Sequence, residues 1–230
     1  MNETKHDQTM ADEFDRWTEN QRAHRMASGH AELVEWILNR WMQEFSDNTK
    51  VLDIGCGIGE SLAQCKKKGI QQLFGIDVSP KMIEQAQAHF PEGSFKVASA
   101  SSLPFDSNSF DFVLSIESLY YHEDPKISLQ EALRVLKPGG WFGSAIELFL
   151  ENPVGTIWQK ALSVPVHCWS ETQWQALLDS VGFENPKAVR IPRTPKPKSE
   201  FTPSVHFPSY QLYLDYTQAG ALYLEGKKKK

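Results

Sequence analysis

The stretch Val51-Leu-Asp-Ile-Gly-Cys-Gly-Ile-Gly-Glu60 constrains the fold of this 230-residue chain more than any other. Its apolar run, 51–54, is typical of a buried parallel strand, and the three glycines that follow interrupt it before helix-compatible sequence begins. Glycines in such a turn allow positive φ and leave no Cβ between the backbone and a ligand. The helix start beyond them presents free N–H groups and the positive end of a dipole. The pattern therefore predicts a strand, a tight turn and a helix that can seat an anion.

Two acidic residues narrow the ligand that this turn would bind. Asp53 adds an acceptor near the carboxyl end of the first strand, and a second apolar run, 73–76, ends in Asp77. An acid at the end of the second strand is placed to accept hydrogen bonds from ribose hydroxyls. Together the two runs predict a ligand that is a nucleoside with a polar tail. They do not distinguish among NAD, FAD and S-adenosylmethionine. A purely structural turn without a ligand is the alternative.

The alternation of segments along the chain predicts an α/β fold with a doubly wound parallel sheet. Further strands are expected at 94–98, 110–116, 141–146, 187–191 and 221–225, and helices at 61–68, 79–89, 126–136 and 170–182. Before the sheet we expect a frayed end at 1–10, an amphipathic helix at 11–25, a break at Gly29 and a second helix at 30–45. After it come an irregular aromatic-rich insertion at 147–170, a proline-rich connector at 192–208 and a short helix at 210–217.

Charge and cysteine content disfavour several classes of protein. The net charge is −5, whereas binding to nucleic acid calls for a basic surface. Cys56, Cys65 and Cys168 are odd in number and form no C-x-x-C pair, so neither a disulfide framework nor a metal site is expected. No signal peptide and no run of the ~20 apolar residues of a membrane span is visible. We expect a cytoplasmic protein of one domain, and its oligomeric state stays open.

Four segments resemble, in order, motifs of the class I S-adenosylmethionine-dependent methyltransferases. Residues 51–60 resemble the first motif and 77–86 the second. Leu103-Pro-Phe-Asp-Ser-Asn-Ser-Phe-Asp-Phe-Val113 resembles the "LPF…SFD" segment of the ubiquinone-biosynthesis-like (type 11) branch, and 131–140 resembles its helix-to-strand turn. The resemblance covers 51–145. It implies a Rossmann-like methyltransferase fold, with a seven-stranded, mostly parallel sheet whose last strand is antiparallel.

The resemblance also implies that three segments of this single domain have different roles. Residues 1–45 would form a helical lid, 46–146 the cofactor-binding core, and 147–230 the substrate-side elements, with aromatic-rich cap insertions and the last strands. Phe14, Trp17, Met26 and His30 resemble a segment that folds over the cofactor mouth in related enzymes. Simple packing of Trp17 and Met26 on the sheet is the alternative.

The cofactor implied by the resemblance is S-adenosyl-L-methionine, with S-adenosyl-L-homocysteine as its product. Gly55 and Gly57 would give close backbone approach to the methionine moiety, and Asp53 would receive its ammonium group. A backbone carbonyl at Ser115 or Ile116 would meet the same ammonium.

The adenosine end of the cofactor is implied at the next two strands. Asp77 would take the ribose diol, with Val78 and Met82 as walls for adenine. Ser99 stands where family members often carry an Asp for the adenine amino group, which leaves that group to the hydroxyl and to backbone atoms. The full set of expected cofactor residues is Asp53, Gly55, Cys56, Gly57, Asp77, Val78, Met82, Ser99, Ala100, Ser101, Ser115 and Ile116.

Candidate catalytic residues lie in Glu117-Ser-Leu-Tyr-Tyr-His122. Methyl transfer from a sulfonium is an in-line displacement, so the protein must align the nucleophile and, for O–H or N–H acceptors, take a proton. His122 has a suitable unperturbed pKa for a base, although the family's common histidine here aligns with Tyr121. Glu117 and His167 are further candidates for the base, and Tyr121 and Trp169 are expected to line the acceptor pocket.

The expected function is methyl transfer to a small-molecule acceptor through an O, N or C nucleophile. Aromatic residues within 149–169 and 201–216 favour an apolar, planar or cationic acceptor. The chain has no Asn-Pro-Pro-Tyr motif, which disfavours methylation of nucleic-acid amino groups. The alternatives are a protein or RNA methyltransferase, a cofactor-binding protein without catalysis, and an NAD-linked oxidoreductase.

Overall fold

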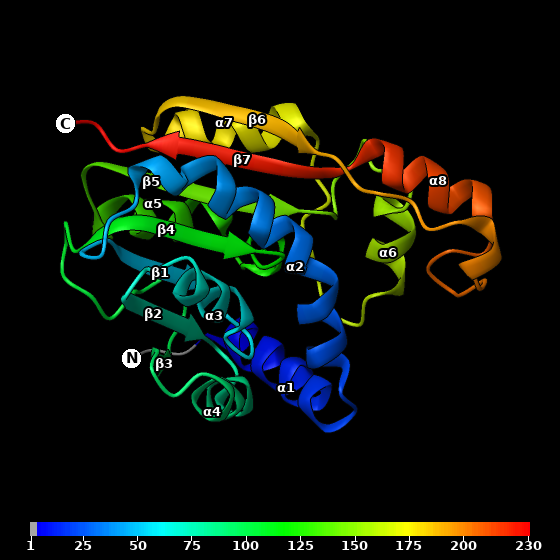
Figure 1. The fold of residues 1–230 in the computed structure, drawn as a ribbon, viewed down its shortest axis with the longest axis horizontal. Coiled ribbons are helices and arrows are strands. Elements are labelled where there is room, and N and C mark those ends of the chain that lie inside the picture. The colour runs from blue at the N-terminus through cyan, green and yellow to red at the C-terminus, as the bar shows by residue number, and fades with distance from the viewer. Residues whose placement is uncertain (1–3) are drawn as a thin grey trace.

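The computed structural model describes residues 4–230 and contains a seven-stranded sheet in the order β3-β2-β1-β4-β5-β7-β6 (Figure 1). The first five strands pair in parallel, and β7 is antiparallel to both of its neighbours. The predicted fold class, a doubly wound sheet with an antiparallel last strand, is therefore confirmed. The strands are β1 (Lys50–Ile54), β2 (Gln72–Asp77), β3 (Ser94–Val97), β4 (Phe110–Ile116), β5 (Leu136–Ile146), β6 (Glu184–Ile191) and β7 (Ala221–Lys227).

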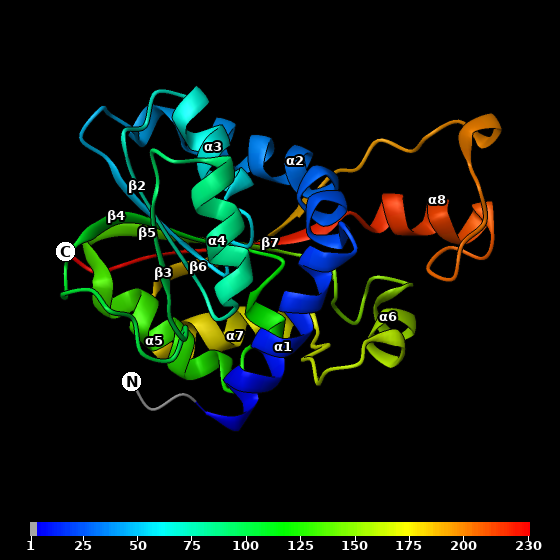
Figure 2. The same cartoon turned by 90° about the horizontal axis from the view of Figure 1, so that it is seen from below.

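Helices cover both faces of this sheet (Figure 2). The α-helices are α1 (Lys5–Glu19), α2 (Arg22–Trp41), α3 (Glu60–Lys67), α4 (Pro80–His89), α5 (Pro125–Val135), α6 (Gly155–Ala161), α7 (Glu171–Val181) and α8 (Tyr210–Ala219). Short 3₁₀ turns occupy Met42–Glu44, Leu119–Tyr121 and Lys198–Glu200. Apolar side chains of α2, α3 and α4 form one buried cluster with the sheet, and those of α5 and α7 belong to a second. Within residues 4–230, no helix is long and apolar enough to cross a membrane.

The N-terminal segment differs from the sequence-based expectation in two ways. Helix α1 begins at Lys5, inside the part predicted to fray, because Thr4 and Asp7 form a reciprocal capping box and Met10 is buried. Gly29 does not break the next helix, since α2 runs through it from Arg22 to Trp41. A glycine inside a helix costs about 0.5–1 kcal/mol, and burial of the apolar face of α2 offsets that cost.

Two further boundaries were predicted wrongly. Strand β5 starts at Leu136 rather than Trp141, because the backbones of Gly139 and Gly140 bond to Lys228 just beyond β7. Helix α6 forms inside the segment expected to be irregular. The capping box that starts α7 and the proline that starts α4 are both present as predicted. Strong local sequence signals therefore predicted where helices α4 and α7 start, whereas hydrogen bonds between distant segments determined where strand β5 begins.

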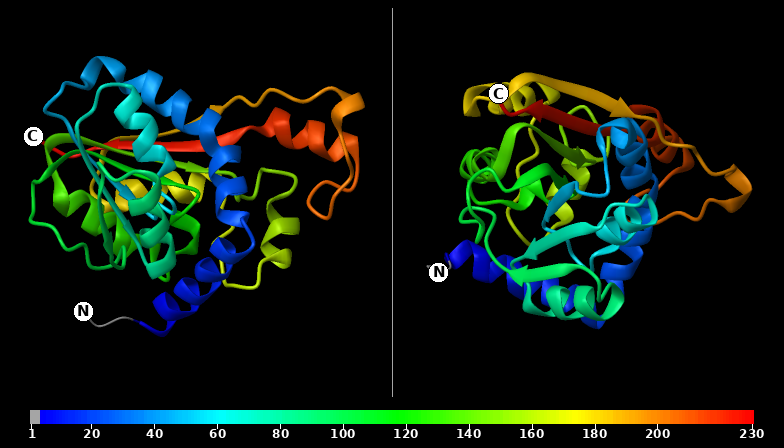
Figure 3. Two further views of the ribbon diagram at one scale, coloured as in Figure 1. Left: turned by 60° about the horizontal axis from the view of Figure 1, so that its bottom comes forward. Right: turned by 60° about the vertical axis from the view of Figure 1, so that its left-hand side comes forward.

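The N-terminal helices lie at the carboxyl ends of the parallel strands (Figure 3). Helix α1 contacts α4, and α6 and α8 lie beyond the same end of the sheet. The crevice where ligands bind in open α/β sheets is at this end. In this chain α1 and the start of α2 lie over it.

Candidate functional site

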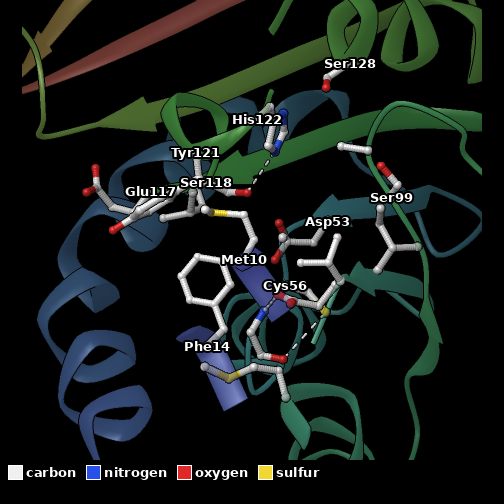
Figure 4. Close-up of a pocket in the computed structure, with 18 of the residues that line it drawn as sticks. Met10, Phe14, Asp53, Cys56, Ser99, Glu117, Ser118, Tyr121, His122 and Ser128 are labelled. Carbon is white, nitrogen blue, oxygen red and sulfur yellow. Dashed lines mark hydrogen bonds between the residues drawn. The ribbon is translucent and has the colours of Figure 1, made fainter. Parts of the chain in front are cut away.

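A cavity opens at the carboxyl ends of β1, β2 and β4, beneath α1 and α2 (Figure 4). All of the predicted cofactor residues line it except Ser115, whose hydroxyl is buried inside the sheet. The predicted catalytic residues Glu117, Tyr121 and His122 line it as well. In the close-up, Glu117 and Ser99 lie on opposite sides of Asp53. The motifs that are separated in the sequence thus converge on one cavity.

The glycine turn adopts the left-handed conformation that the sequence predicted. Gly55, Gly57 and Gly59 have φ values of 75°, 50° and 81°. A Cβ on Gly55 would lie 1.9 Å from the Ser118 hydroxyl, whereas a Cβ on Gly57 would have no atom within 4 Å. The Gly57 N–H donates to Asp77 Oδ2 at 3.0 Å. Gly55 is thus required by a neighbouring side chain, and Gly57 leaves open space beside the turn.

The two predicted cofactor acids are both buried, and burial raises both pKa values. The pKa of Asp53 rises to about 7 and that of Asp77 to about 6. Asp53 Oδ2 accepts a hydrogen bond from Ser61. Its Oδ1 atom is buried and has no hydrogen-bond partner in the described part of the chain. A buried orphan acceptor beside an open glycine turn fits the ammonium group of S-adenosylmethionine, because that cation would supply the missing donor.

Helix α1 makes polar contacts around the cavity. Asp15 Oδ1 accepts hydrogen bonds from the Ser79 hydroxyl and from the Lys81 backbone at 3.2 Å. His6 Nε2 lies 2.7 Å from the Tyr121 carbonyl. Four residues proposed for the lid line the cavity: Phe14, Trp17, Met26 and His30. Sequence analysis missed His6, Asp7 and Met10, which also line it, because the polar N-terminus was read as frayed.

His122 is poorly suited to act as a base in this structure. Burial lowers its pKa to about 3, and its Nε2 atom pairs with the Ser118 hydroxyl at 3.1 Å. His167 and Trp169, the other two residues expected near the acceptor, contact other groups. His167 binds the His122 carbonyl at 3.0 Å, and Trp169 packs on Trp174 with ring centroids 4.6 Å apart. Neither His167 nor Trp169 is among the residues that line the cavity.

Glu117 is held in an unusual conformation by a buried polar cluster. Its φ is +52°, which is rare for a residue other than glycine and is often found at functional sites. Tyr120 Oη donates to its carboxylate at 2.8 Å, and the Glu147 backbone N–H also donates to it. Burial and the Glu147 carboxylate raise the pKa of Glu117 well above its usual range. A raised pKa makes this group a stronger proton acceptor once it ionises.

Glu147, at the end of β5, connects this cluster to the substrate-side segments. Arg193 donates to Glu147 Oε1 through Nε at 2.9 Å and through Nη2, and Tyr216 Oη donates to the same oxygen at 2.5 Å. Ligand atoms of His30, Glu117 and Glu147 lie within 4.8 Å of one another, close enough to share a metal ion. The guanidinium already neutralises Glu147, which makes this trio a poor site for a divalent cation. Neither Glu147 nor Arg193 was expected as a site residue from the sequence.

Comparisons with known proteins identify the family of this chain. A family model described as "Methyltransferase domain" matches residues 52–143. The O-methyltransferase resE of Aspergillus sclerotiorum is 35% identical over 58% of this chain and 54% of its own length. The uncharacterized methyltransferase YodH of Bacillus subtilis is 30% identical over 74% of this chain and 82% of its own length. The chain spans just over half the length of the fungal enzyme.

Solved structures extend the likeness to almost the whole chain. A chain in the complex between the Haloferax volcanii Trm112 methyltransferase activator and its methyltransferase partner has a TM-score of 0.86 at 30% identity, covering 95% of this chain and 98% of that one. A phosphoethanolamine N-methyltransferase of Haemonchus contortus, solved with S-adenosyl-L-methionine, shares the fold with a TM-score of 0.68 at 19% identity, over 87% of this chain and 53% of that one. The chain therefore belongs to the S-adenosylmethionine-dependent methyltransferases of class I.

Proposed function

We propose that this methyltransferase transfers the methyl group to an O–H or N–H nucleophile of a small molecule, with Glu117 as the proton acceptor. The observation that carries the proposal is the buried Glu117 carboxylate, which lines the same cavity as the glycine turn at only 9% exposure. The fungal relative resE, an O-methyltransferase, supports an oxygen nucleophile.

The cofactor supplies an already activated methyl group, so the chain's main task is alignment. In this proposal the Asp53 carboxylate binds the cofactor ammonium and the Asp77 carboxylate binds the ribose diol. The same placement would direct the sulfonium side toward Glu117, because Glu117 lies after β4, beside β1 in the sheet. Phe14, Tyr120 and the other aromatic walls would exclude water from the acceptor.

Glu117 is a better candidate for the base than its neighbours. Burial holds His122 neutral, and because burial lowers its pKa to about 3, the neutral imidazole attracts a proton only weakly. Burial also raises the pKa values of the Tyr120 and Tyr121 phenols, so both stay protonated near neutral pH. Glu117 starts from an ordinary pKa of 4.5, far below that of a phenol, so an upward shift of its pKa strengthens it as a proton acceptor, and it lies on the cavity wall. The cover of α1 and α2 over the cavity also favours a small acceptor over a folded macromolecule.

The test combines an acceptor screen with a pair of variants. Wild-type protein is incubated with radiolabelled S-adenosylmethionine and with small phenols and amines, peptides or RNA, and labelling of small molecules is expected. Glu117→Gln should lower kcat by about 10²–10⁴-fold, as loss of a general base does. Its affinity for S-adenosylhomocysteine should stay unchanged, and His122→Gln should retain most of the activity. Labelling of RNA or peptides alone, or loss of activity in His122→Gln but not in Glu117→Gln, would contradict the proposal.

A macromolecular acceptor with an activator protein is a second candidate. The Haloferax volcanii methyltransferase that this chain resembles over nearly its full length was solved with Trm112. That likeness favours a partner protein that activates the enzyme. Co-expression with the Trm112 homologue of the host, followed by size-exclusion chromatography, tests it. Co-elution at 1:1 together with methylation of RNA or protein would favour this candidate over the small-molecule acceptor.

A further inference from the structure

The cavity extends past Asp77 to the loop that follows β3. Strand β3 pairs with β2, and the Ala98 N–H that begins this loop donates to the Asp77 carbonyl at 2.9 Å. A cofactor whose polar tail lies at the β1 turn and whose ribose lies at Asp77 would place its base beside this loop, since the strands follow in the order β1, β2, β3. The groups on this wall therefore decide which base is accepted.

The Ser99 hydroxyl on this wall is already engaged. It donates its proton to Asp7 Oδ1 at 3.1 Å and accepts a hydrogen bond from the Ser101 N–H at 3.2 Å. The Ser101 hydroxyl lies 2.8 Å from Ser99 Oγ, and because an ionised Asp7 can only accept, Ser101 acts as the donor in that pair when Ser99 bonds Asp7. With its single proton directed at Asp7, the hydroxyl orients a carboxylate that comes from α1. Sequence motifs could not show this contact, because 92 residues separate its two partners.

The Asp7 side chain is a carboxylate with free hydrogen-bonding capacity at this end of the cavity, and unlike the exposed Glu123 it is buried. It lines the cavity and is only 9% exposed. Its Oδ2 atom accepts from the Thr4 N–H at 3.3 Å, and an ionised carboxylate has about four acceptor sites. Asp15 and Asp124 also lie near the cavity, but Asp15 binds Ser79 and Lys81, and Asp124 caps α5.

We propose that Asp7 accepts a hydrogen bond from the exocyclic amino group of the cofactor's adenine, with Ser99 as the positioning residue. This inference rests on the cofactor placement proposed above. It assigns to α1 a direct part in cofactor recognition in addition to covering the cavity. A base with an oxygen in place of the amino group would present an acceptor to a carboxylate, and binding would weaken.

Calorimetry with two product analogues tests the proposal without catalysis. S-adenosylhomocysteine carries the 6-amino group, and S-inosylhomocysteine carries a 6-oxo group. Wild-type protein should prefer the adenosyl compound by about ten- to a hundredfold, the range for a hydrogen bond to a charged group. Asp7→Ala should lose most of that preference, whereas Asp12→Ala, at an exposed position of α1 that bonds only to Gln8 among the described residues, should keep it.

A second pair of variants separates recognition from folding. Asp7→Ala combined with Ser99→Asp moves the carboxylate onto the loop and should restore the adenosyl preference. Asp7→Asn keeps an oxygen for the Thr4 N–H and turns an amide donor toward the base, so the preference should shift toward the inosyl analogue. The proposal is overturned if Asp7→Ala weakens both analogues equally, or if all variants keep the wild-type preference. If the wild-type protein bound neither analogue, the cofactor placement itself would be refuted.

Discussion

Two pairs of carboxylates are buried at the carboxyl ends of the strands, Asp53 with Asp77 on the proposed cofactor side and Glu117 with Glu147 on the proposed acceptor side, but the two pairs are held differently. Asp53 and Asp77 are linked by one glycine turn, and one oxygen of Asp53 has no partner within residues 4–230. Glu117 accepts a hydrogen bond from Tyr120, three residues along the chain, and Glu147 accepts hydrogen bonds from Arg193 and Tyr216, which come from distant segments. Asp53 is therefore open to a cationic ligand, whereas the second pair is already compensated by the protein.

This difference implies different consequences of mutation. A change on the cofactor side should alter ligand affinity more than stability, because the ligand supplies the missing partner. A change on the acceptor side should alter stability first, since a buried charge loses the partner that the fold provides. Four predictions test this contrast, in decreasing order of expected effect.

Arg193→Met should cause the largest loss of stability. The Arg193 side chain is only 10% exposed and bonds to Glu147, whose side chain is 7% exposed. Removing one member of a buried pair typically costs about 3–5 kcal/mol because the other charge stays buried without compensation. Urea unfolding measures the change. Arg193→Met combined with Glu147→Met should recover most of it, and Arg16→Met, in an exposed pair, should change stability by less than about 1 kcal/mol. Equal effects of Arg193→Met and Arg16→Met would contradict the contrast.

Asp77→Ala should weaken binding of S-adenosylhomocysteine by about 1–3 kcal/mol, the range for leaving a polar partner without its hydrogen bond. The loss also frees the Gly57 N–H, which now donates to Asp77 Oδ2. Calorimetry at pH 8 measures the affinity, and unfolding of the unliganded protein provides the control. If stability fell more than affinity, the two acids of the cofactor side would be structural and the contrast would fail.

The affinity for S-adenosylhomocysteine should depend on pH below about 7. The free protein holds Asp53 and Asp77 with pKa values of about 7 and 6, and the ligand binds the ionised forms. Affinity should therefore fall as the pH drops through these pKa values, by up to about tenfold per unit for each group, and level off above pH 8. The stability of the unliganded protein should change with pH in the opposite direction to the affinity. Both folded pKa values exceed the ordinary 3.8, so these groups lower the free energy of unfolding as the pH rises from about 4 to 7. Calorimetry and urea unfolding at several pH values check both signs, and Asp53→Asn should flatten the upper part of both curves.

The same contrast explains what the sequence could and could not predict. The glycine turn, Asp53 and Asp77 lie within or directly after short strands whose local patterns are strong, so their convergence followed from the order of parallel strands. The contacts of Glu147 with Arg193 and Tyr216 depend on β5, the proline-rich connector and α8 meeting in space. No local pattern encodes such a meeting. The start of α1 was missed for a related reason, since a polar segment buries Met10 only because the cavity lies beneath it.

Gly29→Ala and Gly57→Ala form a matched pair with the smallest expected effects. A Cβ at either position would meet no atom within 4 Å, so the two sites differ mainly in backbone conformation. Gly29 lies inside α2, where alanine should stabilise the protein by about 0.4–1 kcal/mol. Gly57 has φ of +50°, where a side chain should cost about 1–2 kcal/mol. Thermal unfolding measures both. Gly29→Ala should also leave the affinity for S-adenosylhomocysteine unchanged if α2 serves only as a rigid wall. A more stable Gly29→Ala protein with weaker binding would show that α2 must bend at this residue to admit the cofactor.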